Sequence, residues 1–218
     1  MTRPTGRRRT PAKRGNSNRS ETASLGRPPV ISLPEILETA TTLARQVGVS
    51  RLTMSMLADN LGVTAAALYH YIPSREALVA HVVDAACDRV KEPPTGPWDL
   101  RLRTFERSVR NELRGIRLHL PETFQAGQPP ASYRRLFETG VKILSETGAD
   151  PQEVLLAYAT VAAFMTGQLW FDNSTHNPES GEATYLSLSG AEGAFDSDDL
   201  FEYGLARVID GVRNRLTR

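Results

Sequence analysis

Residues 61–78 read LGVTAAALYHYIPSREAL, and this stretch decides the fold. Gly62 is suited to end one short apolar helix, and Thr64 is a typical N-cap for the three alanines that follow. Pro73 stops the second segment, because the residue before a proline is pushed out of helical geometry. The stretch therefore predicts two short helices joined by a tight turn that contains glycine.

Longer helical patterns flank this stretch on both sides. Before it, apolar residues recur at helical spacing across 36–47, between Pro34 and Gly48. After it, Ser74 is the expected N-cap of a helix that runs to Val90. Two short helices braced by longer ones are typical of a helix-turn-helix, whose second helix enters the DNA major groove.

The second short helix has the composition of a DNA-reading element. Small side chains at 65–67 allow its backbone to approach base edges closely. Tyr69 and Tyr71 carry hydroxyls that can bond phosphate, and His70 can donate or accept at a base edge. Arg75 can hold a phosphate through a charge-assisted hydrogen bond. The alternative, ordinary solvated surface at His70 and Arg75, stays open.

The stretch LTMSMLADNLGVTAAALYHYIPSREALV, residues 52–79, resembles the DNA-binding signature of the TetR family of bacterial repressors. The resemblance implies an all-α homodimer, with an N-terminal three-helix helix-turn-helix DNA-binding domain and a C-terminal helical ligand-binding and dimerisation bundle. Ser55 and Met56 stand where the family often has arginine, and Tyr71 where it often has histidine. By position, the resemblance places DNA contacts on Thr53, Ser55, Thr64, Ala65, Ala66, Ala67, Tyr69, His70, Tyr71 and Arg75.

Charge is distributed unevenly along the 218 residues, although the net charge is only +1. Residues 1–29 hold eight basic residues and one acidic residue, a net of +7, which leaves −6 for residues 30–218. The first segment is also rich in Pro, Gly, Ser and Thr. It predicts a disordered arm with a polyanionic partner, and a solubilising tail is the alternative.

The proline-rich sequence EPPTGP at 92–97 predicts a boundary within the chain. We therefore expect a basic arm at 1–29, a DNA-binding domain at 30–91 and a ligand-binding and dimerisation domain at 92–218.

Four helical patterns follow in the C-terminal half. A helix starting near Trp98 carries an arginine row, expected to be a solvated face paired with local acids such as Glu106 and Glu112, with an anion site as the alternative. Residues 130–147 are amphipathic, and 154–171 are apolar nearly all round, which predicts a core helix rather than a membrane span. The last pattern places apolar residues at helical spacing from Phe201 onward.

Two further sets of residues follow from these helices. Aromatic residues of this half could line a cavity for an apolar inducer, although plain core packing is the alternative for each of them. The cavity set is Phe105, Phe124, Tyr133, Phe137, Tyr158, Phe164 and Trp170. The apolar helix and the last helix are expected to form half of a four-helix dimer bundle. The interface set is Leu155, Ala162, Phe201, Leu205, Val208 and Val212.

The sequence offers no catalytic chemistry. It shows no glycine-rich phosphate loop, no nucleophile motif and no Cys/His cluster, so no enzyme activity and no cofactor are expected. Asp172, His176 and Glu179 fall close together but at no recognised metal spacing. With one cysteine, Cys87, and no secretory pattern, a cytoplasmic location is expected.

The most direct interpretation is therefore a homodimeric repressor that binds a palindromic operator and is released by a small molecule. A DNA-architectural protein without a ligand, or an enzyme with an ancestral helix-turn-helix, are the alternatives. The sequence does not identify the inducer or the operator. It also does not distinguish a repressor from an activator.

Overall fold

The computed structural model describes residues 31–116, 131–175 and 196–216. Within those ranges the chain forms eight α-helices and one short 3-10 helix and no strand, which confirms the predicted all-α class. The predicted basic arm, Phe124, His176 and Glu179 lie outside the described residues.

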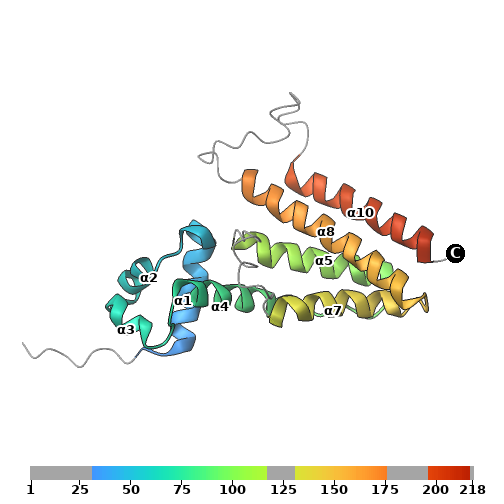
Figure 1. The fold of residues 1–218 in the computed structure, drawn as a ribbon. Coiled ribbons are helices and arrows are strands. Elements are labelled where there is room, and N and C mark those ends of the chain that lie inside the picture. The colour runs from blue at the N-terminus through green and yellow to red at the C-terminus, as the bar shows by residue number, and fades with distance from the viewer. Residues whose placement is uncertain (1–30, 117–130, 176–195, 217–218) are drawn as a thin grey trace, which may run out of the picture.

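The N-terminal part, residues 31–87, is called the reading head here and lies at one end of the molecule (Figure 1). The 3-10 helix η1 links its first two α-helices. Its elements are α1 (Leu33–Val47), η1 (Val49–Arg51), α2 (Met54–Leu61), α3 (Ala65–Tyr69) and α4 (Arg75–Cys87).

Side-chain caps fix where these helices begin. The hydroxyl oxygens of Thr53, Thr64 and Ser74 each accept a hydrogen bond at 3.2 Å from the backbone N–H three residues further on. Gly62 has φ +65°, a left-handed conformation that glycine adopts without strain, and it turns the chain between α2 and α3. The predicted caps Thr64 and Ser74 and the predicted glycine turn are thus confirmed, while α3 ends at Tyr69, before Pro73.

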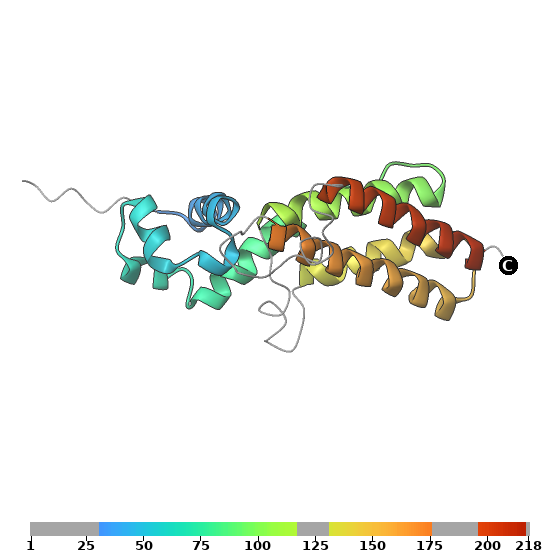
Figure 2. The same ribbon diagram turned by 90° about the horizontal axis from the view of Figure 1, so that it is seen from above.

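The C-terminal part, called the body here, is a bundle of four long helices. They are α5 (Trp98–Gly115), α7 (Ala131–Ser145), α8 (Pro151–Thr175) and α10 (Ser197–Leu216). Helices α8 and α10 run side by side, and α4 extends from the reading head toward α5 and α7, so that the molecule is elongated (Figures 1 and 2).

Helix α8 has two different faces. One face is buried against α5, α7 and α10, through Val154, Tyr158, Val161 and other residues. The opposite face leaves Leu155 and Leu156 50% and 59% exposed. The segment Pro151–Asn173 is long and apolar enough to cross a membrane by length and composition, but 39% of it is buried among the other helices. We read it as a core helix with one uncovered side.

Trp170 is placed differently from the prediction. It was assigned to a cavity, yet it lies on the uncovered side of α8 and is 50% exposed. The sequence pattern is apolar on every side of this helix, so it could not distinguish the inner face from the outer face.

Helix α10 turns its apolar stripe inward. Phe201, Leu205 and Val212 are at most 5% exposed within a single protomer, so assigning them to the surface of a dimer interface was wrong. Val208 and Ala162 are half-buried, and Leu155 is the predicted interface residue that is clearly exposed. A helical stripe is satisfied by any apolar neighbour, and here α5 and α8 of the same chain provide it.

The arginine row on α5 pairs with distant acids, contrary to the expectation of local partners. Arg107 pairs with Glu202 and Arg114 with Asp198, both on α10. Glu112 pairs with Arg45 of α1 at 2.7 Å. Glu106 is buried, and no ion pair with the described residues involves it.

Candidate nucleic-acid interface and body interior

Helix α3 presents a short, exposed surface of small and hydrogen-bonding side chains. Ala66, Tyr69, His70 and Tyr71 are exposed, and only Leu68 of this helix is buried. The buried Leu68 fixes the rotation of α3 on the reading head, so that Ala66 and Tyr69 face outward while Ala65 and Ala67 are half-buried. The predicted reading residues therefore share one accessible surface, although their contact with DNA stays a prediction.

Helix α2 contributes the neighbouring part of this surface. Thr53 and Ser55 are exposed, whereas Met54 and Leu57 are buried beneath them. The capping oxygens of Thr53 and Thr64 accept backbone N–H groups, which leaves each hydroxyl hydrogen able to donate to a phosphate. Helix capping and phosphate binding are thus compatible at these two threonines.

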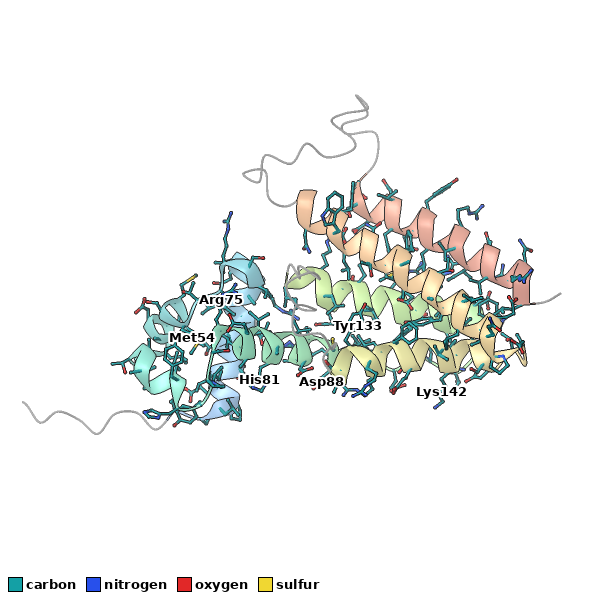
Figure 3. The ribbon with its side chains drawn as sticks, viewed as in Figure 1. Met54, Arg75, His81, Asp88, Tyr133 and Lys142 are labelled. Atoms are coloured by element: carbon teal, nitrogen blue, oxygen red, sulfur yellow. The ribbon has the colours of Figure 1, made fainter. Side chains whose placement is uncertain are left out.

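Arg75, labelled in Figure 3, has a structural role that the sequence pattern did not indicate. Its Nε donates to the carbonyl oxygen of Leu52 at 2.9 Å, and one Nη donates to those of Ser50 and Val49 at 2.8 and 3.2 Å. These bonds tie the first residue of α4 to the η1 segment. Much of the guanidinium is therefore already used within the reading head, and phosphate binding by Arg75 is no longer its simplest role.

The body brings together a polar group that we call the Glu106 cluster: the buried Glu106 and Tyr158, the half-buried Tyr133 and the exposed Thr166. Glu106 is 1% exposed, and one of its oxygens, Oε1, has no hydrogen-bond partner within the described parts of the chain. Burial raises the pKa of Glu106 to about 8, and a hydrogen bond with Tyr158 opposes this rise. Tyr133 lies at the start of α7 (Figure 3). It is hydrogen-bonded to Thr166 of α8.

Tyr158 holds this cluster against α7. Its ring meets Phe137 edge-on, with centroids 4.9 Å apart and planes at 75°. A Cβ added at Gly140 would lie 1.9 Å from the Tyr158 ring, so only glycine permits this close approach. Burial raises the pKa of Tyr158 well above its ordinary value, so its hydroxyl remains protonated at neutral pH.

The predicted cavity residues divide between two sites. Tyr133, Phe137 and Tyr158 lie with the Glu106 cluster, and Phe105 is buried next to Glu106 in sequence. Phe164 instead stacks on Phe201 at 6.3 Å, between α8 and α10.

A second polar interior site joins α5, α8 and α10. Arg110 is 3% exposed and donates Nε and Nη2 to the two carboxylate oxygens of Asp172 at 2.8 and 2.9 Å. It also bonds Asp198 at 2.8 Å and lies 4.4 Å from the centroid of the Phe201 ring. Asp172, weighed above as a metal ligand, is thus the partner of a buried guanidinium. We call Arg110, Asp172 and Asp198 the arginine clamp.

Several contacts join the reading head to the body. Arg45 bonds Glu112, and the backbone N–H of Val49 donates to the carbonyl of Ile116 at 3.1 Å. Other contacts come from the α4 side, where Asp84 bonds Ser132 and Asp88 bonds Arg135. The two parts are therefore connected at the C-terminal ends of the reading head's two longest helices, α1 and α4.

Comparison with known proteins agrees with this geometry. Residues 36–82, which span α1 to α4, match the family model described as bacterial regulatory proteins, tetR family. The class A tetracycline repressor protein from transposon 1721 of Escherichia coli is 28% identical over 200 residues, covering 83% of this chain and 89% of that protein.

Solved structures share the fold along most of the chain. TetR from Acinetobacter baumannii AYE superposes with a TM-score of 0.66 at 22% identity, covering 84% of this chain and 97% of that one. BioQ bound to its double-stranded DNA operator superposes with a TM-score of 0.63 at 20% identity, covering 84% and 98%. The chain is therefore similar to the TetR family of bacterial transcriptional regulators, through its helix-turn-helix at residues 36–82 and through the fold of its all-helical body.

Proposed function

We propose that this protein is a homodimeric repressor that binds a palindromic operator and releases it when a small molecule binds the body. Members of the family are DNA-binding repressors with ligand-binding C-terminal domains. The observation that carries the proposal for this chain is the exposed α3 surface, capped by Thr64 and bearing Tyr69, His70 and Tyr71. We expect it to act in the cytoplasm, where the operator is.

The side chains of α3 suggest how the operator is read. Alanines can touch a thymine methyl but cannot form the bidentate hydrogen bonds that discriminate bases by ~1–3 kcal/mol each. Base reading by hydrogen bonds then rests chiefly on Ser55 and His70, with DNA shape contributing elsewhere. Tyr69, Tyr71 and the hydroxyls of Thr53 and Thr64 hold the phosphates and set the register.

The test measures binding to DNA from upstream of the protein's own gene and to a library of its single-base variants at fixed salt. His70→Ala should relax the preference at one base position in each half-site and leave overall affinity nearly unchanged. Gln46→Ala, exposed on α1 beside a residue that contacts α5, is the matched control. An even loss of affinity across the library would make His70 a positioning residue. Sequence-blind binding by the unaltered protein would favour the architectural alternative.

The uncovered side of α8 supports the homodimer. Leu155, Leu156 and Trp170 on α8 and Tyr203 on α10 are each at least half exposed. A groove of about 420 Å³ separates the two helices on this side, lined by Leu156, Val208 and other residues. Apolar surface of this extent is typical of a protein interface. We propose that a second copy of the chain covers it and sets the spacing of the two reading heads.

The double variant Leu155→Arg, Leu156→Arg tests this interface. We expect a folded monomer, detected by analytical ultracentrifugation, with much weaker operator binding because two half-sites can no longer be held together. Leu100→Arg, at an equally exposed leucine on α5, should remain dimeric. A dimer that survives the double change would place the interface elsewhere.

The contacts between the reading head and the body support the proposed release mechanism. A ligand can shift the spacing of the heads only by binding one arrangement better than another. Operator binding requires half-sites about one helical turn apart, roughly 34–36 Å. The coupling is reciprocal, so operator DNA should weaken ligand binding by the factor by which ligand weakens operator binding. Ligand affinity that is the same with and without operator would contradict this mechanism.

A further inference from the structure

The body encloses a carboxyl group that forms no ion pair with any residue the structure describes. Glu106 Oε1 is buried and has no partner among the described residues. The neighbouring arginines of α5 are used elsewhere, Arg107 on Glu202 and Arg110 on the arginine clamp. A buried polar atom without a hydrogen bond is rare in native proteins, because it loses water without replacement. Something that binds here would supply the missing donor.

The surroundings of Glu106 indicate what kind of group that is. Tyr158 and Tyr133 bring aromatic rings from α8 and α7, and Phe137 packs edge-on against Tyr158. Aromatic faces attract organic cations, and a carboxylate is the natural acceptor of a protonated amine. Among the described residues, no ion pair involves Glu106, and the pKa of its carboxyl group is set by burial and by the hydrogen bond with Tyr158.

We infer that the interior between α5, α7 and α8 binds a small molecule with a protonated amine beside an aromatic or apolar body, and that Glu106 receives the amine. This inference rests on the proposed function, because it names the chemical class of the inducer. The amine N–H donates to Oε1, and the rings of Tyr133 and Tyr158 lie alongside the organic body.

The protonation state of Glu106 gives this site a signature. Because burial raises the pKa of Glu106 to about 8, the empty site holds mostly the neutral acid at pH 7. A bound ammonium favours the carboxylate, so binding releases a proton. The other titratable groups near Glu106 stay protonated at pH 7. Burial raises the pKa of Tyr158 and of Tyr133, and it raises the pKa of Cys87 to about 11.

The test uses two probes of the same shape, 2-(1-naphthyl)ethylamine and 2-(1-naphthyl)ethanol, with the full-length protein in a titration calorimeter. We expect the amine to bind about 10-fold or more tightly than the alcohol, the typical strength of a hydrogen bond between charged groups. Titration at pH 7 in buffers of different ionisation heat should show proton release with the amine alone. Equal affinity for the two probes, or binding of neither, overturns the inference.

Variants locate the effect. Glu106→Gln should lose the preference for the amine and the proton release, and Glu138→Gln, exposed on α7, should keep both. Tyr158→Phe keeps the carboxylate and should retain the preference, and circular dichroism checks that each variant is folded. A Glu106→Gln variant that still prefers the amine overturns the assignment. If the unaltered protein does not bind the operator in gel shifts, the proposed repressor function is refuted. The probe affinities do not depend on that result, so the two failures can be told apart.

Discussion

The reading head and the body of this protein have cores of different kinds. Among the described residues of the head, Thr41 is the one buried polar side chain, and its hydroxyl donates to the Leu37 carbonyl of its own helix at 2.7 Å. The body instead buries charged and polar groups from several helices. They are Glu106, Arg110, Ser132, Gln168, Asp172 and Asn173.

The difference follows from where each part does its work. The head acts through its surface, so an apolar interior that simply holds α3 in place is sufficient. The body acts through its interior, if it binds a ligand, and there polar groups have to be held in defined positions. The following predictions test this division, from the largest expected effect to the smallest.

The arginine clamp should be the most sensitive point of the body. Arg110→Leu leaves the buried Asp172 without its cation, which should reduce the free energy of unfolding by about 3–5 kcal/mol. Arg107→Leu breaks an exposed pair on the same helix and should cost at most ~1 kcal/mol. Denaturant unfolding followed by circular dichroism measures both. Similar losses in the two variants would mean that the polar interior of the body contributes no more than its surface.

Glu106 should make the stability of the body depend on pH. The pKa of Glu106 is 4.5 ordinarily and about 8 when buried, so between these values the folded state binds a proton that the unfolded state releases. Stability should therefore fall as pH rises through this window, by an amount on the order of a few kcal/mol. Glu106→Gln should remove this fall, as measured by thermal unfolding across the window. An unchanged pH profile in the variant would show that Glu106 is solvated.

Arg75 offers the matching test in the reading head. Arg75→Ala removes the donor to three carbonyl oxygens and should cost about 1–3 kcal/mol, with operator affinity falling in parallel. Arg75→Lys keeps the charge but not the fork of donors and should recover only part of the loss. If stability is instead unchanged while the salt dependence of binding falls by one phosphate contact, Arg75 lies on the DNA, as first expected.

The cap of α3 should give the smallest effect. Thr64→Ala removes the side-chain acceptor for the Ala67 N–H and should cost ~1 kcal/mol of stability. Thr64→Ser keeps the hydroxyl and should be close to neutral. Operator affinity, measured by fluorescence anisotropy, should drop in Thr64→Ala, because α3 is only five residues long and depends on its cap. A full operator affinity in Thr64→Ala would mean that DNA itself orders this helix.

The sequence predicts the reading head more completely than the body, because the contacts that form the head are local in sequence and those of the body are not. Caps such as Thr53, Thr64 and Ser74 act within three residues, so local pattern is enough to find them. The partners of Arg107 and Arg110 lie 95 and 62 residues away, on helices whose relative placement no local pattern contains.

The errors in the body share this origin. Glu106 looked like a surface partner for its neighbouring arginines, and the stripe of α10 looked like a dimer face. Glu106 and the apolar stripe of α10 are each buried by other helices of the same chain. The residues next to Glu106 in the sequence, Thr104 and Phe105 among them, give no local sign that its carboxyl group is buried.

Val49 is connected to both parts of the molecule through the two peptide groups that flank its Cα. Its N–H donates to Ile116 at the end of α5, and its C=O accepts from Arg75 at the start of α4. The Val49 amide proton is therefore shielded from solvent only while α5 stays seated on the head. Its rate of exchange with deuterium should report that seating directly, so one amide can record whether a ligand in the body has reached the DNA-reading end.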